Sequence, residues 1–333
     1  MNSKSEHFKL FADCIPVKGK KRSIIYDLSR TTYKYIPNDL YYILTFYEGK
    51  TIEQVKQLYD KKNSPVIDEY FQFLTDYEYI FFCDKDELGH FPKLLKQWDY
   101  PGIISNSIIE LPIKVSEIIP MLKILENLGC RYLQFRSFEE LKVEYLNQIL
   151  DSIKFSNFEY VELILKKGGN NSTEYMELFT NHQRLRSIYL HSSDENKIEK
   201  NPNNGRQIII STIESKKSHV DFQTNNKYYF NVDKSLFFES QFYNSYYNKK
   251  ICITKELQIK NCLSLDKEFG LANNEETILK IVNSTEFKEL WEVKKSKIID
   301  CRKCEYRFMC VDNTPLIKKK NYWQLKNSCF YKP

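Results

Sequence analysis

Four cysteines near the C-terminus constrain this chain more than any other feature. Cys301, Cys304, Cys310 and Cys329 all fall within the last 33 of its 333 residues. The Cys-x2-Cys spacing of the first pair lets two thiolates of one tight turn reach the same metal, and the other two would complete a tetrahedral set. Buried free cysteines are the alternative, since cysteine packs well as a small hydrophobe. A four-sulfur metal site is the better prediction, and sulfur ligands suit zinc and iron–sulfur clusters alike.

Several classes of protein are excluded or disfavoured by what the chain lacks. It contains no phosphate-binding P-loop motif and no dinucleotide-binding glycine motif. There is no run of about eighteen apolar residues and no charged-then-apolar signal peptide, so we expect a cytoplasmic protein with no membrane partner. Nine cysteines in a reducing compartment point to metal ligation and not to disulfides. A net charge of +6 is too modest to suggest a nucleic-acid partner.

Residues 1–95 are predicted to form a small winged-helix-like domain. Three short β-type runs, Phe8–Cys14, Ser23–Leu28 and Thr31–Ile36, are separated by turn residues. Three amphipathic helices follow. Asn38 or Asp39 is expected to cap the first, a Thr51-x-x-Gln54 capping box the second, and Pro65 to begin the third.

This domain resembles a known peptide-binding family. Asp27-Leu28, Ile36-Pro37-Asn38 and Gly49-x-Thr51 are similar to the peptide-carrier protein of pyrroloquinoline quinone biosynthesis, and hence to the precursor-peptide recognition element of many peptide-modifying enzymes. The resemblance implies that a leader peptide adds as a strand to the edge at 31–36, beside a wall formed by helix 66–77. The peptide-binding residues that it implies are Tyr33, Lys34, Tyr35, Ile36, Ile67, Tyr70, Phe71 and Leu74.

A winged helix could instead bind nucleic acid. A helix that enters a DNA groove normally carries clustered Lys and Arg. Helix 66–77 instead carries Asp68, Glu69 and Asp76 and no basic residue, which favours a peptide ligand.

The middle of the chain, residues 96–245, alternates strand and helix patterns. This alternation predicts an α/β domain with a parallel sheet and right-handed crossovers, an incomplete (β/α) barrel. Glu110, Arg136 and His191 stand near the carboxyl ends of expected strands, where barrel sites gather, and we expect them to line the remaining cavity. The polar, Asn-rich segment 192–206 is expected to be a loop.

Residues 246–333 resemble the SPASM domain, the auxiliary-cluster module of many radical S-adenosylmethionine enzymes. The match consists of Cys262, Trp291, Cys301-x2-Cys304-x5-Cys310 and Cys329. It implies one [4Fe–4S] cluster held by the last four cysteines, with zinc as the alternative. Where the family has a further cysteine of a second cluster, this chain has Thr314, so the resemblance implies a single metal site.

The cysteine motif that defines radical S-adenosylmethionine chemistry is missing. Such enzymes need Cys-x3-Cys-x2-Cys after the first barrel strand, yet no cysteine follows Ser107–Leu111 until Cys130. One thiolate cannot hold a cluster. We therefore expect a degenerate radical-SAM-like barrel that binds no S-adenosylmethionine and has no catalytic residue of this chemistry.

Taken together, the three regions resemble the SPASM-domain peptide maturase of grasp-with-spasm systems. Phe11-Ala-Asp-Cys14 and Cys304-Glu-Tyr-Arg-Phe-Met-Cys310 look characteristic of that family. The resemblance implies two partners, a precursor peptide and an ATP-grasp ligase, and an accessory role in maturing a ribosomally made peptide. The alternative is a redox enzyme that uses the one remaining cluster.

Overall fold

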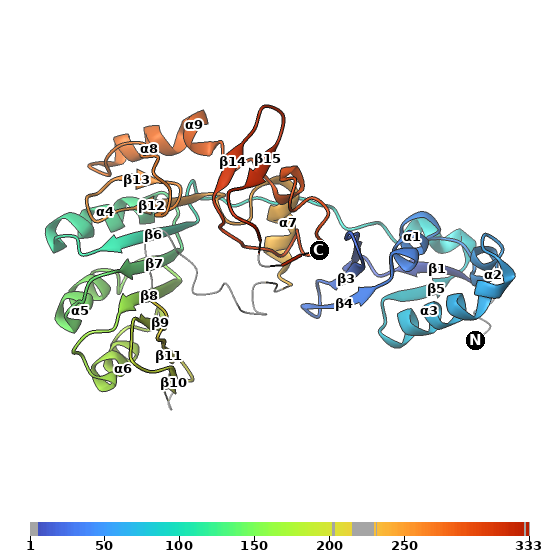
Figure 1. The fold of residues 1–333 in the computed structure, drawn as a ribbon, viewed down its shortest axis with the longest axis horizontal. Helices are drawn as coiled ribbons and strands as arrows, with labels where there is room; N and C mark the ends of the chain where they lie inside the picture. The colour runs from blue at the N-terminus through green and yellow to red at the C-terminus, as the bar shows by residue number, and fades with distance from the viewer. Residues whose placement is uncertain (1–5, 202–203, 215–229, 231, 330, 333) are drawn as a thin grey trace. The chain divides into compact units, whose positions relative to one another are not determined.

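A computed structural model describes residues 6–201, 204–214, 230, 232–329 and 331–332. The chain forms two compact units, each assembled from separate stretches of sequence (Figure 1). The first unit comprises Met1–Trp98, Asn225–Ser245 and Val293–Pro333, and the second comprises Asp99–Thr224 and Tyr246–Glu292. The sequence suggested three consecutive domains, 1–95, 96–245 and 246–333. The boundaries differ because the last forty or so residues pack on the N-terminal sheet, as described below.

The N-terminal part of the first unit holds two small antiparallel sheets. Strands β2 (Cys14–Val17), β3 (Ser23–Asp27) and β4 (Thr32–Ile36) form one, in that order, while β1 (His7–Leu10) pairs with the distant β5 (Ile80–Cys83). The single strand expected over 8–14 is therefore wrong. A turn closed by the bond from the Cys14 N–H to the Phe11 carbonyl, 2.9 Å, divides it into two strands of different sheets.

Three helices follow, as predicted: α1 (Asn38–Phe46), α2 (Ile52–Lys56) and α3 (Ser64–Asp76). The Thr51–Gln54 capping box is confirmed. The expected cap of α1 is wrong, because the Asn38 side chain instead accepts a hydrogen bond from the Ser23 hydroxyl at 2.6 Å. Short 3-10 turns occupy Lys61–Asn63 and Lys85–His90.

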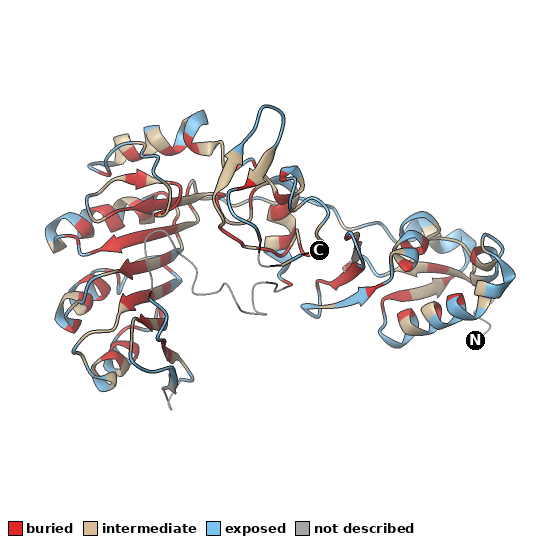
Figure 2. Ribbon diagram, viewed as in Figure 1, coloured by how far each residue is buried: buried red, intermediate tan, exposed pale blue. Residues whose placement is uncertain are grey.

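Both faces of the three-stranded sheet are covered, and all five residues of β3 are buried (Figure 2). On one face, Ile25 and Ile36 pack against the three helices. On the other, Ile24 and Tyr26 pack against Phe237 of helix α7 (Lys234–Phe242) and against residues of the cysteine-rich segment, Tyr306 and Met309. This second layer includes a 3-10 turn (Lys295–Lys297) and a hairpin of β14 (Leu316–Lys318) with β15 (Trp323–Leu325).

The second unit contains an eight-stranded sheet in the order β10-β11-β9-β8-β7-β6-β12-β13. The six central strands are parallel, which confirms the predicted parallel sheet. These strands are β6 (Asn106–Leu111), β7 (Tyr132–Ser137), β8 (Tyr160–Lys166), β9 (Leu185–His191), β11 (Gln207–Ile210) and β12 (Lys250–Ile253). Antiparallel strands β10 (Lys197–Lys200) and β13 (Ile259–Lys260) form its two edges. The loop expected over 192–206 thus contains β10.

Helices α4 (Val115–Asn127), α5 (Val143–Ser152) and α6 (Ser172–Asn181) connect successive parallel strands and lie along one face of the sheet (Figure 1). Right-handed crossovers place consecutive helices on the same face. Helices α8 (Glu275–Asn283) and α9 (Thr285–Lys288) follow β13. Beyond the end of α4, Gly129 adopts φ +85° and approaches Gly102 so closely that a Cβ on Gly129 would lie 2.5 Å from the Gly102 Cα.

Candidate peptide-binding strand and cysteine cluster

Strand β4 is an edge strand. In the described part of the chain it pairs with β3 and with no other strand. Its outer edge therefore presents backbone N–H and C=O groups that another extended chain can bond. Four of the residues expected to bind peptide, Tyr33, Lys34, Tyr35 and Ile36, lie on this strand.

Side chains alternate between the two faces of β4, as in any strand. Ile36 is buried in the core beneath the helices. Lys34, on the same face, is exposed, and its ammonium lies 4.8 Å from the ring centroid of Tyr77, just beyond the end of α3. On this face of the edge strand, Lys34 therefore lies beside the residue that directly follows α3.

Three of the four wall residues expected on α3 are in the wrong place for that role. Ile67, Phe71 and Leu74 are buried in the domain core, where the Phe71 ring meets that of Phe8 with centroids 5.0 Å apart. They face the core because this aliphatic and aromatic stripe supports the sheet. Only Tyr70 is part-exposed.

A second stripe on α3 was missed. Tyr70, Phe73 and Tyr77 are spaced i, i+3 and i+7, so they share one helix face. The rings of Phe73 and Tyr77 have centroids 4.9 Å apart, and Tyr77 is exposed. The spacing was visible in the sequence, but it competed with the more apolar stripe of Ile67, Phe71 and Leu74.

The opposite face of β4 meets an aromatic cluster centred on Tyr306, which lies between Cys304 and Cys310. Its ring centroid is 5.8 Å from that of Tyr33 and 6.3 Å from that of Tyr35, and its hydroxyl bonds the Tyr35 hydroxyl. Phe230 stacks on it with centroids 3.9 Å apart. Burial raises the pKa of Tyr306 far above its ordinary value, so the phenol stays neutral.

The neighbouring residue, Glu305, anchors this segment to the sheet. Its backbone carbonyl accepts a 2.6 Å hydrogen bond from the Tyr26 hydroxyl of β3. Its buried carboxylate accepts bonds from the Tyr331 hydroxyl at 2.5 Å and the Arg22 Nε at 3.3 Å. The Arg22 guanidinium also lies over the Tyr35 ring, 3.5 Å from its centroid. A buried charged group held by several donors fixes its segment firmly.

The four C-terminal cysteines belong to the same region of the first unit. Cys301 and Cys304 share a turn closed by the bond from the Cys304 N–H to the Cys301 carbonyl, 2.9 Å. Cys301 and Cys329 pack against one apolar cluster, and Cys304 against the cluster on β3. Burial raises the pKa of the Cys301 thiol to about 12, with a contribution from nearby Cys310. The structure thus brings the four sulfurs into one neighbourhood.

The neighbourhood is not a formed metal centre. Among the residues that the structure describes, no three His, Cys, Asp or Glu side chains converge closely enough to hold a metal ion. The donor types suit zinc or an iron–sulfur cluster, but the sulfurs would have to move closer together to share one. Thr314, which stands where the resemblance implies a missing cysteine, donates its hydroxyl to the Asp312 carboxylate at 2.9 Å.

A buried lysine faces these cysteines. Lys295, 3% exposed, donates to the Asp312 backbone carbonyl at 2.7 Å and lies 3.8 Å from its carboxylate. Burial acts to lower the pKa of Lys295, but the negative charges of the Cys310 thiolate form and of the Asp312 carboxylate outweigh it and raise the pKa overall. The Lys295 ammonium therefore keeps its positive charge beside the four cysteines.

In the second unit, Glu110 and Arg136 lie opposite each other in the register of β6 and β7, on the same face of the sheet. Arg136 donates to Gln134, which bonds Glu162 of β8. His191 bonds the Ser137 carbonyl through Nε2 at 2.9 Å. Burial lowers the pKa of His191.

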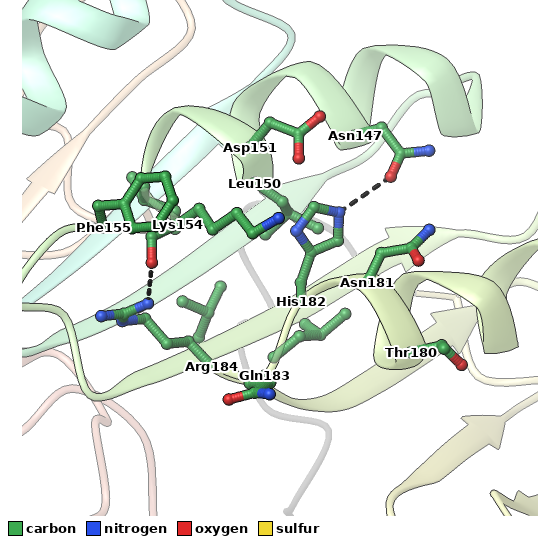
Figure 3. Close-up of a pocket in the computed structure, with 13 residues that line it drawn as sticks. Asn147, Leu150, Asp151, Lys154, Phe155, Thr180, Asn181, His182, Gln183 and Arg184 are labelled. Atoms are coloured by element: carbon green, nitrogen blue, oxygen red, sulfur yellow. Dashed lines mark hydrogen bonds between the residues drawn. The ribbon is translucent and has the colours of Figure 1, made fainter.

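A cavity of about 810 Å³ lies at the other end of this sheet, near the amino ends of β8 and β9 (Figure 3). His182 bonds the Asn147 side chain at 2.9 Å, and burial lowers its pKa. Arg184 donates to carbonyls that follow α5, including that of Phe158. Barrel sites gather at the carboxyl ends of strands, so this cavity is not at the expected position.

No protein-family model matches this chain, and no curated protein matches it. It is similar to solved structures of SuiB from Streptococcus suis. With S-adenosylmethionine bound, SuiB is 9% identical over 91% of this chain and 94% of that chain, at a TM-score of 0.39. With the precursor peptide SuiA bound, SuiB is likewise 9% identical over 91% of this chain and 94% of that chain, at a TM-score of 0.40. At these values the likeness assigns neither a family nor an activity. In the described residues no helix is long and apolar enough to cross a membrane.

Proposed function

We propose that this protein binds the leader of a ribosomally made precursor peptide as a strand added to β4, and presents it to an ATP-grasp ligase. The observation that carries the proposal is the edge of β4, which no other described strand pairs, with exposed Lys34 lying against Tyr77 of the aromatic stripe. Strand addition supplies affinity through the main chain and selectivity through side-chain pockets. The motifs at residues 27–38 and 49–51 resemble a recognition element that works in this way.

The aromatic border is needed for useful affinity. A hydrogen bond contributes a net of about 1 kcal/mol, so a short strand gains only about 3–5 kcal/mol from its main chain. A micromolar complex requires about 8 kcal/mol. Part-exposed Tyr70 and Phe73 and exposed Tyr77 can supply the difference by burying apolar side chains of the peptide.

The proposal includes no radical step. Residues 112–116, which follow β6, contain none of the three cysteines that would chelate a cluster at that position. The role of the second unit is then structural, or lies in docking the ligase. A fold does not by itself confer radical chemistry, and this chain lacks the three cysteine ligands that such chemistry needs after β6.

The test uses the full chain and a synthetic copy of any short peptide whose reading frame is found beside its gene. We expect micromolar or tighter binding by titration calorimetry, and about a tenfold loss with Tyr77→Ala because one aromatic contact is removed. The matched control is Phe155→Ala in the second unit, at a side chain that is 95% exposed. It should leave the affinity unchanged.

Strand addition has a signature of its own. An added strand bonds its neighbour through the N–H groups of alternate residues. A series of peptides, each N-methylated at one backbone position, should therefore alternate between weak and normal binding as the methylated position moves along the peptide. Uniform tolerance of N-methylation, or no binding at tens of micromolar, would overturn the proposal.

A further inference from the structure

We infer that the cysteine-rich segment supplies a second side-chain subsite, so that the bound peptide is held on both of its faces. This rests on the proposed function, because the subsite lies along the same strand, β4. The subsite is the exposed ring of Tyr35, positioned by Tyr306 from one side and by Arg22 from another. A recognition domain with nothing packed on this second face of its sheet would lack this subsite.

The alternation of β4 separates the two subsites. Lys34 lies on the face bordered by α3, whereas Tyr33 and Tyr35 lie on the face that meets Tyr306. A strand paired with β4 has the same two-residue period, so its successive side chains point alternately to the two faces. One set of peptide residues would contact Tyr70, Phe73 and Tyr77, and the other would contact Tyr35.

Tyr35 is built to receive a side chain. It remains 43% exposed, while Tyr306 beneath it is only 3% exposed. Its hydroxyl is bonded to that of Tyr306, and the Arg22 guanidinium lies 3.5 Å from its ring centroid. A ring already held in place loses little conformational freedom when a ligand packs on it. Tyr306 is a positioning residue, because it acts through Tyr35.

The two subsites define the class of peptide. A half-buried strand usually alternates apolar and polar residues, because only one face is covered. Here both faces offer aromatic surface, so the leader should carry apolar or aromatic residues at three or more consecutive positions. An acidic residue should stand opposite Lys34, whose ammonium is exposed at the α3 face.

The test is a set of double-mutant cycles on the full chain with the same synthetic peptide. Each peptide residue is changed to alanine and measured against the parent, Tyr35→Ala and Phe73→Ala. We expect Tyr35→Ala to couple, by about threefold or more, with peptide positions of one parity, and Phe73→Ala with the other parity. Tyr306→Leu should reproduce the parity of Tyr35→Ala, which a general loss of stability cannot do.

Tyr35 is part-exposed, so its alanine variant is expected to fold, and thermal unfolding checks this. If Tyr35→Ala weakens all peptides equally, or none, the second subsite is overturned while strand addition stands. If no peptide binds the parent protein, the proposed function itself fails and the subsite with it.

Discussion

The Tyr26 hydroxyl donates a 2.6 Å hydrogen bond to the backbone carbonyl of Glu305, which stands 279 residues later in the chain. Tyr26 is fully buried on the central strand of the N-terminal sheet, and Glu305 lies between two of the clustered cysteines. This bond joins the candidate peptide-binding sheet to the cysteine-rich segment.

Tyr26→Phe should destabilise the first unit. The substitution keeps the ring but leaves the buried Glu305 carbonyl without its donor, at a cost of about 1–3 kcal/mol. Urea unfolding followed by fluorescence measures the change. Tyr322→Phe, at a side chain that is 44% exposed, is the matched control and should have no effect. Equal stability of the two variants would mean that the bond contributes nothing.

The stability of the protein should fall in alkaline solution. Burial raises the pKa of Cys130 from 9.0 to about 12, so the folded state keeps the neutral thiol. The unfolded chain releases that proton above pH 9, and the free energy of unfolding therefore decreases between pH 9 and pH 12. At pH 10, one unit above the ordinary value, Cys130 accounts for about 1.4 kcal/mol of the loss.

Cys130→Ala isolates that contribution from the titration of other groups. Its free energy of unfolding should fall less than that of the parent between pH 8 and pH 10. Parallel pH curves for the two proteins would show that this thiol is not the cause.

Gly129→Ala should be strongly destabilising. The residue has φ +85°, and an added Cβ would meet the Gly102 backbone at 2.5 Å. Strain of this kind costs at least about 1–2 kcal/mol, and the steric overlap adds to it. Gly169→Ala in the same unit is the control, because nothing lies within 4 Å of its added Cβ. Chemical denaturation should separate the two; a mild effect at Gly129 would indicate that the backbone moves easily.

Anaerobic purification with metal and sulfide analysis tests the predicted [4Fe–4S] cluster. We expect iron in the parent protein and its loss in Cys301→Ser, because one thiolate of the set is removed. Cys130→Ser, in the second unit, should retain the metal. Visible absorption that changes reversibly on reduction distinguishes a cluster from zinc. Folded parent protein that contains neither iron nor zinc would refute the predicted cluster and its zinc alternative. The measurement is needed because no three of the described ligand side chains converge on one point.

The local features of the fold could be predicted from the sequence. The Thr51–Gln54 capping box depends on four consecutive residues, and it is present. Strands are expected over 160–166 and 187–191, and the structure forms the parallel pair β8 (Tyr160–Lys166) and β9 (Leu185–His191) there. These elements depend on neighbours in the chain, which a sequence displays directly.

Features that depend on distant partners could not be predicted. The pairing of β1 with β5 joins residues about seventy positions apart, and no local pattern specifies it. Helix α3 carries two apolar stripes, and the sequence does not say which one faces the core. The structure buries Ile67, Phe71 and Leu74 and leaves Tyr77 exposed. Three of the four helix residues expected to bind peptide, Ile67, Phe71 and Leu74, are therefore core residues, whereas the strand residues stay a prediction.

The two-sided burial of β3 has a consequence for how the protein is made. Ile24 and Tyr26 leave the ribosome about 280 residues before their covering partners, Tyr306 and Met309. For most of translation this apolar surface has no native cover, and a prematurely terminated chain never acquires it. We expect this exposed face to be prone to aggregation or chaperone binding until Tyr306 and Met309 are in place.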